Sequence, residues 1–261
     1  MSSLNYRATG AEIQNDNVVV LLHGMFGSKG NLLSIGRVLS DRFHVLAVDL
    51  PGHGDSAPMK EMTFTNMANA LQLFLGELDI TRVHIVGHSL GAKVAMQFAT
   101  LFPELTSSVT VLDISPVTYK GRGHDPVFQA VKELDLESIQ SRNDALTHFL
   151  DYTDDADTAK FILTNLRRAQ AGYEWRIDFD VLSDNYENLA HAPELHDGFA
   201  GPALVLKGEL SAYIQTKHKE LFKAYLPKAS HYIVEGAGHW LHAEKPKEVQ
   251  QHILRFLSKQ I

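Results

Sequence analysis

The segment that most constrains this chain is the G-x-S-x-G pattern at residues 87–91 (GHSLG). Residues 82–86 (RVHIV), just before it, form a β-branched stretch typical of a buried strand, and residues 92–99 (AKVAMQFA) repeat small and apolar residues at helical spacing. Between a strand and a helix, the serine of this pattern sits on a strained turn that glycines permit because they carry no Cβ. We therefore expect Ser89 to present its hydroxyl clear of the backbone as a nucleophile.

Apolar runs alternate with helix-favouring segments on both sides of this turn. Continuous apolar runs such as residues 18–22 (VVVLL) suit parallel strands that are buried on both faces. The alternation predicts βαβ units and a mostly parallel, right-handed, doubly wound α/β sheet. Thr63 or Thr65 is expected to cap the second helix. The expected elements are strands 18–22, 44–49, 82–86, 108–113, 203–207 and 232–234, and helices 31–39, 65–78, 92–99, 217–225 and 246–257.

The alternation stops between Val117 and Pro193. This stretch is predicted to hold charged helical segments at residues 127–139, 143–152 and 157–169 and no clear strand. The economical interpretation is one α/β core, residues 1–116 and 194–261, interrupted by a helical cap at residues 117–193. Apolar cap residues are expected to pack the cap rather than to line a pocket: Val127, Phe128, Phe149 and Trp175.

Composition narrows the functional class. With 261 residues, 44% hydrophobic and 21% charged, the chain has enough apolar material for a sizeable core. A net charge of −7 argues against a nucleic-acid partner. No apolar run approaches the roughly 18 residues that a membrane span needs, and residues 1–10 lack a secretory pattern. Zero cysteines exclude disulfides and a cysteine nucleophile. A cytoplasmic location is the expectation, although a cysteine-free chain also suits an oxidising compartment; the oligomeric state stays open.

A serine nucleophile needs an adjacent base, and the base needs an orienting group. The predicted base is His239, in the glycine-rich loop at residues 236–240 (GAGHW) that follows the last expected strand. The glycines let the chain bend so that the imidazole can reach back over the edge of the sheet. His242 is the nearest rival, and we expect it to pack on the last helix instead.

The acid is less obvious from the pattern. In this architecture an aspartate is commonest near position 211, but that residue is Ser211, and Glu209 lies two residues too early. Asp113 ends the strand after the serine helix, at the carboxyl edge of the sheet where ligand sites collect. It could instead cap a turn. We favour Asp113 as the acid, with Glu209 as the alternative and Ser211 as a donor to the carboxylate or to the imidazole.

The developing oxyanion of an acyl transfer needs two backbone N–H donors. Leu90, directly after the serine, is expected to supply one, and the loop at residues 23–28 (HGMFGS) the other, from Met25 in preference to Phe26. His23 is expected to be structural.

Three side chains beside the reacting centre are predicted to wall a substrate pocket. These are Phe26, His88 and Trp240.

A metal or nucleotide site is not expected. Asp49 and His53 lie close together in sequence, but tight-turn chemistry explains the glycines around His53 without a metal. The chain contains no G-x-G-x-x-G pattern and no phosphate-binding P-loop. No metal or organic cofactor is therefore predicted.

Taken together, five segments resemble the α/β-hydrolase superfamily over essentially the whole chain: HGMFGS, AVDLPGHGDS, GHSLG, VLDISPV and GAGHWLHAEKP. Within it, residues 112–117 (LDISPV), residues 122–125 (RGHD) and the non-acidic Ser211 are similar to a small bacterial esterase group of the YbfF type. The resemblance implies a cap inserted after strand 6 of the family's sheet and the acid after that strand, which supports Asp113. It also implies carboxylesterase or acyl thioesterase activity on short to medium acyl chains, including acyl-CoA esters.

The expected reaction is acyl transfer to water through a covalent intermediate on Ser89. Because the imidazole base must be neutral, and imidazoles ordinarily titrate near pH ~6.5, activity is expected to fall as the pH drops through that region. Enzymes of the same fold that cleave carbon–carbon bonds, haloperoxidases and a lyase share the pattern, and a receptor without turnover is a further alternative.

Overall fold

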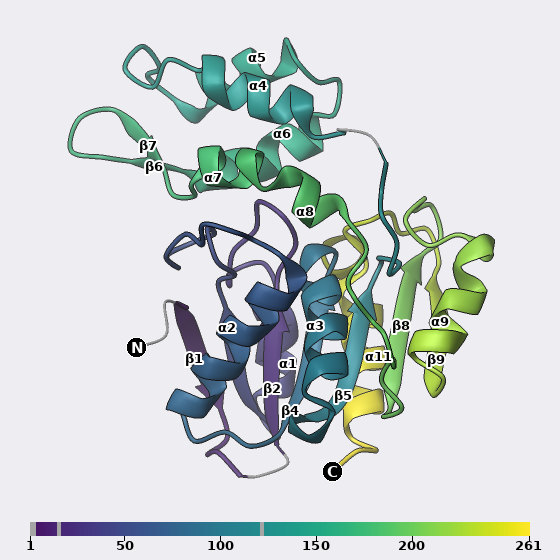
Figure 1. Ribbon diagram of the computed structural model, residues 1–261. Coiled ribbons are helices and arrows are strands. Elements are labelled where there is room, and N and C mark those ends of the chain that lie inside the picture. Colours follow the sequence, from purple (N-terminus) through teal and green to yellow (C-terminus); the bar gives the residue numbers. More distant parts are fainter. Residues whose placement is uncertain (1–3, 15–16, 121–122) are drawn as a thin grey trace.

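The computed structural model describes residues 4–14, 17–120 and 123–261. In these residues the core is a seven-stranded sheet in the order β1-β3-β2-β4-β5-β8-β9, with β1 antiparallel to β3 and the other neighbours parallel (Figure 1). The strands are β1 (Tyr6–Gly10), β2 (Val18–Leu22), β3 (His44–Val48), β4 (Val83–His88), β5 (Thr106–Leu112), β8 (Ala203–Gly208) and β9 (Ala229–Val234).

Helices cover both faces of this sheet (Figure 1). Those of the core are α1 (Leu33–Leu39), α2 (Phe64–Glu77), α3 (Leu90–Leu101), α9 (Lys219–Tyr225), α10 (Leu241–Glu244) and α11 (Pro246–Leu257). Alternate residues of β2 enter two different apolar clusters, one with α2 and α3 and the other with α1 and α11. Burial on both faces is the reason that β2 is a continuous apolar run.

Every strand that the sequence predicts is present, within a few residues at each end. Thr63 caps α2, because its side chain accepts a hydrogen bond from the N–H of Asn66. β1 was not expected. It is an edge strand whose residues are mostly exposed, so it lacks the apolar run by which the other strands are found.

The segment predicted to form the cap, residues 117–193, follows β5, the fifth strand of the described chain. It contains α4 (Asp125–Glu133), α5 (Arg142–Leu150), α6 (Ala156–Ile162), α7 (Phe179–Asp184) and α8 (Tyr186–Ala190). The expectation of no strand here is wrong, since β6 (Leu166–Arg168) and β7 (Tyr173–Trp175) pair as an antiparallel hairpin. Each strand has only three residues, too few to show an alternating pattern.

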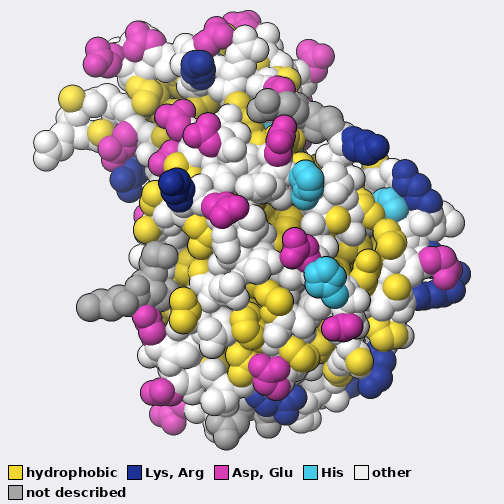
Figure 2. Space-filling view, in the orientation of Figure 1, with side chains coloured by type: hydrophobic (Ala, Val, Ile, Leu, Met, Phe, Trp, Pro, Cys, Tyr) yellow, Lys and Arg dark blue, Asp and Glu magenta, His cyan; other side chains and the backbone are white. Residues whose placement is uncertain are grey.

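The cap lies over the carboxyl edge of the parallel strands (Figure 1). The four apolar cap residues pack into the main apolar cluster, as the sequence predicted. The outer surface of the cap carries many acidic side chains (Figure 2). Between residues 117 and 193 there are 14 Asp and Glu against 8 Lys and Arg, so the cap holds most of the net charge of −7.

No helix in the described part of the chain is long and apolar enough to cross a membrane. Arg122, which contributes to the family resemblance, and residues 1–3 of the amino-terminal segment lie outside the described residues.

Candidate active site

Ser89 occupies the sharp turn between β4 and α3. Its backbone angles, φ 51° and ψ −116°, lie in a region that L-residues rarely adopt. A Cβ at Gly87 would stand 2.4 Å from the carbonyl oxygen of Gly91, and one at Gly91 would stand 2.3 Å from that of Leu22. Both positions must therefore be glycine, because neighbouring backbone atoms come too close to leave room for a side chain. The turn is held because the Ser89 N–H donates to the Leu112 carbonyl of the neighbouring strand.

Asp113 follows the last residue of β5 and is fully buried. Its carboxylate accepts three hydrogen bonds: from the Gly208 N–H at 3.0 Å, from the Ser211 hydroxyl and from Nδ1 of His239 at 2.8 Å. Since a buried carboxylate is costly unless it is paired and hydrogen-bonded, this set of donors is what keeps an ionised Asp113 at the edge of the sheet.

His239 lies on the loop between β9 and α10. An ionised carboxylate only accepts hydrogen bonds, so Nδ1 carries the proton and Nε2 is left as the basic nitrogen. The ring of Tyr213 stacks on the imidazole with centroids 4.0 Å apart. The loop is also fixed, because Glu244 accepts from the N–H groups of Gly238 and Trp240. His239 therefore has little freedom to turn.

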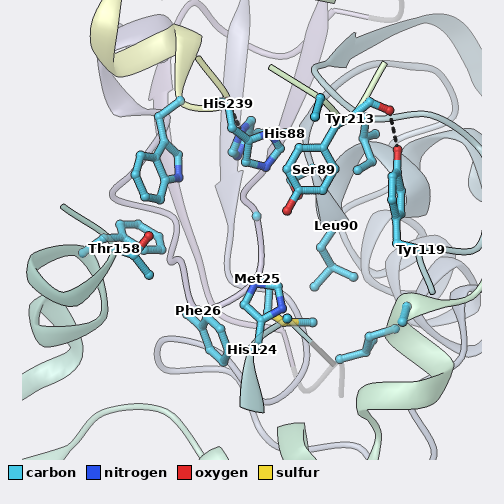
Figure 3. A pocket seen from close by; sticks show the side chains of 18 of the residues that line it. Met25, Phe26, His88, Ser89, Leu90, Tyr119, His124, Thr158, Tyr213 and His239 are labelled. Carbon is cyan, nitrogen blue, oxygen red and sulfur yellow. Dashed lines mark hydrogen bonds between the residues drawn. The ribbon is translucent and has the colours of Figure 1, made fainter. Parts of the chain in front are cut away.

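Ser89 and His239 line the same cavity, which has a volume of about 900 Å³ and lies between the edge of the sheet and the cap. Figure 3 shows both side chains in this cavity, with Tyr213 beside them. Of the hydrogen bonds between described residues, none joins the Ser89 hydroxyl to the imidazole. Both side chains are partly exposed, so a substrate carbonyl can reach them.

The two predicted oxyanion donors also line the cavity. Leu90 is the first residue of α3, where an N–H has no partner within the helix. The N–H groups of Leu90 and Met25 donate to no acceptor in the described residues, and the same holds for Phe26. The positive end of the α3 dipole points at this position and favours a negative oxygen there.

The three side chains predicted to wall the pocket all line it. Phe26 is buried in an aromatic group with Phe128 and Phe179 of the cap. His88 donates from Nε2 to the carbonyl oxygen of His239 at 2.9 Å, so it also supports the loop that carries the imidazole. Trp240 packs against Phe161 of α6.

The rival residues are engaged elsewhere. Glu209 accepts a hydrogen bond from the Gly236 N–H at 2.8 Å. His242 is buried with its ring 4.4 Å from that of His88, and burial lowers its pKa to about 4. His23 accepts from the Leu50 N–H at Nε2 and donates from Nδ1 to the carbonyl of Gly24, a structural arrangement.

The residues that raised the metal alternative have protein partners. Asp49 accepts hydrogen bonds from the backbone and side chain of Lys29 and from the Asp55 N–H. His53 donates from Nδ1 to the Pro51 carbonyl, and burial lowers its pKa to about 3.

Sequence reasoning missed several residues of the cavity. Lys93, Tyr119, His124 and Tyr213 all line it. The signal for Lys93 was a single charged residue within an otherwise apolar helix directly after the serine. Tyr213 gave no such signal, because its loop meets His239 only through the fold.

Comparison with known proteins identifies the family. A family model described as the alpha/beta hydrolase family matches residues 19–251. Esterase YbfF of Escherichia coli K12 is 32% identical over 256 residues, which are 98% of this chain and 99% of that protein. The sn-1-specific diacylglycerol lipase ABHD11 of Mus musculus is 32% identical over 247 residues, 92% of this chain and 80% of that protein.

The solved structures include a marine microorganism esterase with a TM-score of 0.91 and 33% sequence identity, covering 97% of this chain and 98% of that one. The chain therefore belongs to the alpha/beta hydrolase family, and it is a hydrolase of the carboxylesterase type.

Proposed function

We propose that the protein cleaves carboxylic esters or acyl thioesters with Ser89 as nucleophile, His239 as general base and Asp113 as the orienting acid. The observation that carries the proposal is the 2.8 Å hydrogen bond from His239 Nδ1 to the buried Asp113, in a loop that lines the same cavity as Ser89. This bond selects the tautomer that a base needs, with Nε2 free to take a proton.

In the proposed reaction, His239 takes the proton of Ser89 as its oxygen attacks the substrate carbonyl, and then gives it to the leaving alcohol or thiol. Water, activated by the same imidazole, releases the acid and restores the serine. The N–H groups of Leu90 and Met25 stabilise the oxyanion in both halves. Loss of one such donor costs about 3 kcal/mol in the barrier.

Ser211 is proposed to support the acid. Its hydroxyl donates to the same carboxylate oxygen, Oδ2, that accepts from His239, and its own oxygen accepts from the Tyr213 N–H at 3.2 Å. The hydroxyl thus joins the carboxylate to the loop whose tyrosine stacks on the imidazole. Ser211→Ala is expected to lower kcat about tenfold, the usual effect of losing one hydrogen bond to a charged group. Unchanged kinetics would remove Ser211 from the proposal.

The proposed substrates carry short to medium acyl chains. The cavity of about 900 Å³ is near the upper end of the range for small-molecule sites, and the aromatic rings of Phe26 and Trp240 supply apolar walls. His88, the third proposed substrate contact, adds an imidazole whose pKa lies well below its usual range because it is buried. Acyl-CoA thioesters belong to the same proposal, and cytoplasmic residence stays a prediction.

The test is a series of p-nitrophenyl esters from acetate to decanoate, together with acetyl-, hexanoyl- and decanoyl-CoA. Turnover of esters, with kcat/KM highest at a short or medium chain, is expected of the wild-type protein. Ser89→Ala is expected to lower kcat by about 10⁴-fold or more. Full activity of a folded Ser89→Ala protein would overturn the proposal, and turnover of thioesters but not of esters would narrow it.

A further inference from the structure

Lys93 is a buried cation in the wall of the proposed active site. It lies four residues after Ser89 on α3, one helical turn or about 6 Å along the axis. The residue is 2% exposed, and yet it lines the cavity that holds Ser89 and His239. Side chains on a helix lean toward its amino terminus, which for Lys93 is the end that carries the serine.

Within the described residues, no carboxylate pairs with this ammonium group. Its Nζ donates to the carbonyl oxygens of His191 at 2.6 Å and Ala190 at 3.3 Å. It also lies 4.9 Å from the ring centre of Tyr119 and 5.3 Å from that of Phe64. An ammonium group has three donors, so two carbonyls leave one donor without an acceptor. Burial lowers the pKa of Lys93 to about 7, because removing the ammonium group from water disfavours its charged form.

The hydrogen bonds from Lys93 fix the chain at the end of α8, but fixing this segment does not by itself require a cation. One turn further along α3, the buried Gln97 serves the same segment with a neutral side chain, since it donates to the Glu194 carbonyl and accepts from the Glu194 N–H. Gln97 does not line the cavity, whereas Lys93 does. A side chain that can carry a positive charge is therefore present where the helix meets the cavity, and a neutral amide is present where the helix meets only the protein.

The geometry points to Lys93 as a binding residue for a carboxylate on the substrate, so that the preferred substrates are esters carrying one carboxylate. These are half-esters of dicarboxylic acids or acyl esters of hydroxy acids. The inference rests on the proposed function, because it specifies the substrate class of the same site. A substrate carboxylate would accept the remaining N–H and supply the missing counter-charge in a desolvated place, where such pairs are strong.

The charges around the cavity predict how the substrate is oriented in it. Figure 3 shows Tyr119, the ring that Lys93 approaches, and Thr158 on opposite sides of Ser89. Asp155 and Asp157 also line the cavity, at the start of the helix that carries Thr158. The carboxylate is therefore expected on the Tyr119 side, and the uncharged part of the ester on the Thr158 side.

The test on the wild-type protein uses two pairs of esters. Within each pair, one member has a terminal carboxylate where the other has a terminal methyl group. Monoethyl glutarate is compared with ethyl pentanoate for the acyl side, and 4-acetoxybutanoate with butyl acetate for the alcohol side. A kcat/KM about tenfold or more higher for the charged member of either pair is the expected result, and that pair identifies the side. Lower kcat/KM for both charged members would overturn the inference.

The variants Lys93→Gln and Lys93→Met test the residue itself. In each, the ratio of kcat/KM for the favoured charged ester to its neutral partner is expected to fall about tenfold or more. Gln97→Leu is the matched control, since it releases the same segment without touching the cavity, and its ratio is expected to stay that of the wild type. An unchanged ratio in the Lys93 variants, or an equal fall in Gln97→Leu, would overturn the inference.

These outcomes are distinct from failure of the proposed function. If the wild-type protein hydrolyses neutral esters but rejects the charged ones, the inference fails and the hydrolase proposal stands. If it turns over none of the four esters and none of the p-nitrophenyl esters or acyl-CoA thioesters, the proposed function is refuted and the inference falls with it. The wild-type comparison needs no variant, so it still tests the inference if the Lys93 variants do not fold.

Discussion

The edge of the sheet and the cap face the same cavity but are held in different ways. At the edge, Asp113 and His239 are fixed by short hydrogen bonds to buried partners. The cap meets the core through polar contacts spread over several segments, among them the side chain of Asn165 donating to the Phe26 carbonyl and the partly exposed pair of Arg176 with Asp55.

The two regions also differ in charge. The cap has 14 acidic against 8 basic residues, whereas the remaining chain has 17 against 16. The comparison teaches that positional precision belongs to the sheet edge, where a displaced imidazole would stop the proposed proton transfer. The cap contributes the shape of the cavity and most of the net negative charge, and it reaches the proposed base indirectly, through the Tyr119 hydroxyl that donates to the Tyr213 carbonyl.

The largest expected effect concerns Asp113, the proposed acid at the sheet edge. Asp113→Asn is expected to lower kcat by about 10³- to 10⁴-fold, because an amide can donate to Nδ1 and thereby hold the wrong tautomer. Glu209→Gln, a second carboxylate one loop away, is the matched control and is expected to change kcat less than about threefold. Ester hydrolysis assays on both variants decide the matter, and the reverse ranking would assign the acid to Glu209.

A second effect tests how rigid the turn at the serine is. A Cβ at Gly91 would stand 2.3 Å from the Leu22 carbonyl, so Gly91→Ala is expected to destabilise the fold by about 3 kcal/mol. Gly76 lies in α2 with nothing within 4 Å of its Cβ position. Gly76→Ala is expected to stabilise by about 0.5–1 kcal/mol. Denaturant unfolding measures both, and equal effects would deny the close packing described for the turn.

The buried His242, three residues after His239, gives a pH-dependent effect. Burial lowers the pKa of His242 to about 4, below its value in the unfolded chain. The unfolded state therefore binds the proton first, so stability is complete above about pH 6.5 and is lost as the pH falls toward 4. The loss is on the order of 2–3 kcal/mol from this residue.

His242→Leu is expected to flatten that part of the stability curve, as measured by thermal unfolding between pH 7 and pH 4. Other buried histidines keep part of the slope, since burial also lowers the pKa of His23 to about 4. A variant with the full wild-type slope would contradict the assignment to His242.

The smallest effect belongs to the contact between cap and core. Arg176 forms two hydrogen bonds with Asp55, at 3.1 and 2.6 Å, but both groups are partly exposed. Arg176→Ala is expected to cost about 0.5–1 kcal/mol, or a fall in Tm of about 2 °C. Arg167, which pairs with Glu174 inside the cap hairpin, is the control, and Arg167→Ala is expected to shift Tm less. A larger shift for Arg167→Ala would show that the ion pair does not secure the cap.

The same contrast explains what the sequence could predict. The core strands are predictable from the sequence because a strand that is buried on both faces consists of a continuous apolar run, as in β2. The serine turn is predictable because a side chain at either of its two glycines would collide with the backbone, so both positions must be glycine. The exposed β1 and the three-residue strands of the cap carry no comparable pattern.

The site divides in the same way. Ser89, Asp113 and His239 stand at the ends of strands or on glycine-rich turns, so their places follow from the topology. The cavity residues Tyr213 and Tyr119 come together only through packing of two loops, where the Tyr119 hydroxyl donates to the Tyr213 carbonyl at 2.7 Å. Such loop contacts depend on side-chain packing, which no local sequence pattern encodes.

The most direct test of the proposed chemistry is covalent labelling with an active-site fluorophosphonate, followed by intact mass and peptide mapping. One adduct per chain is expected, on the peptide that contains Ser89. Labelling is expected to vanish in Ser89→Ala and to slow by orders of magnitude in His239→Gln. An adduct on another residue, or equal labelling of a folded Ser89→Ala protein, would contradict the assignment of Ser89 as the nucleophile.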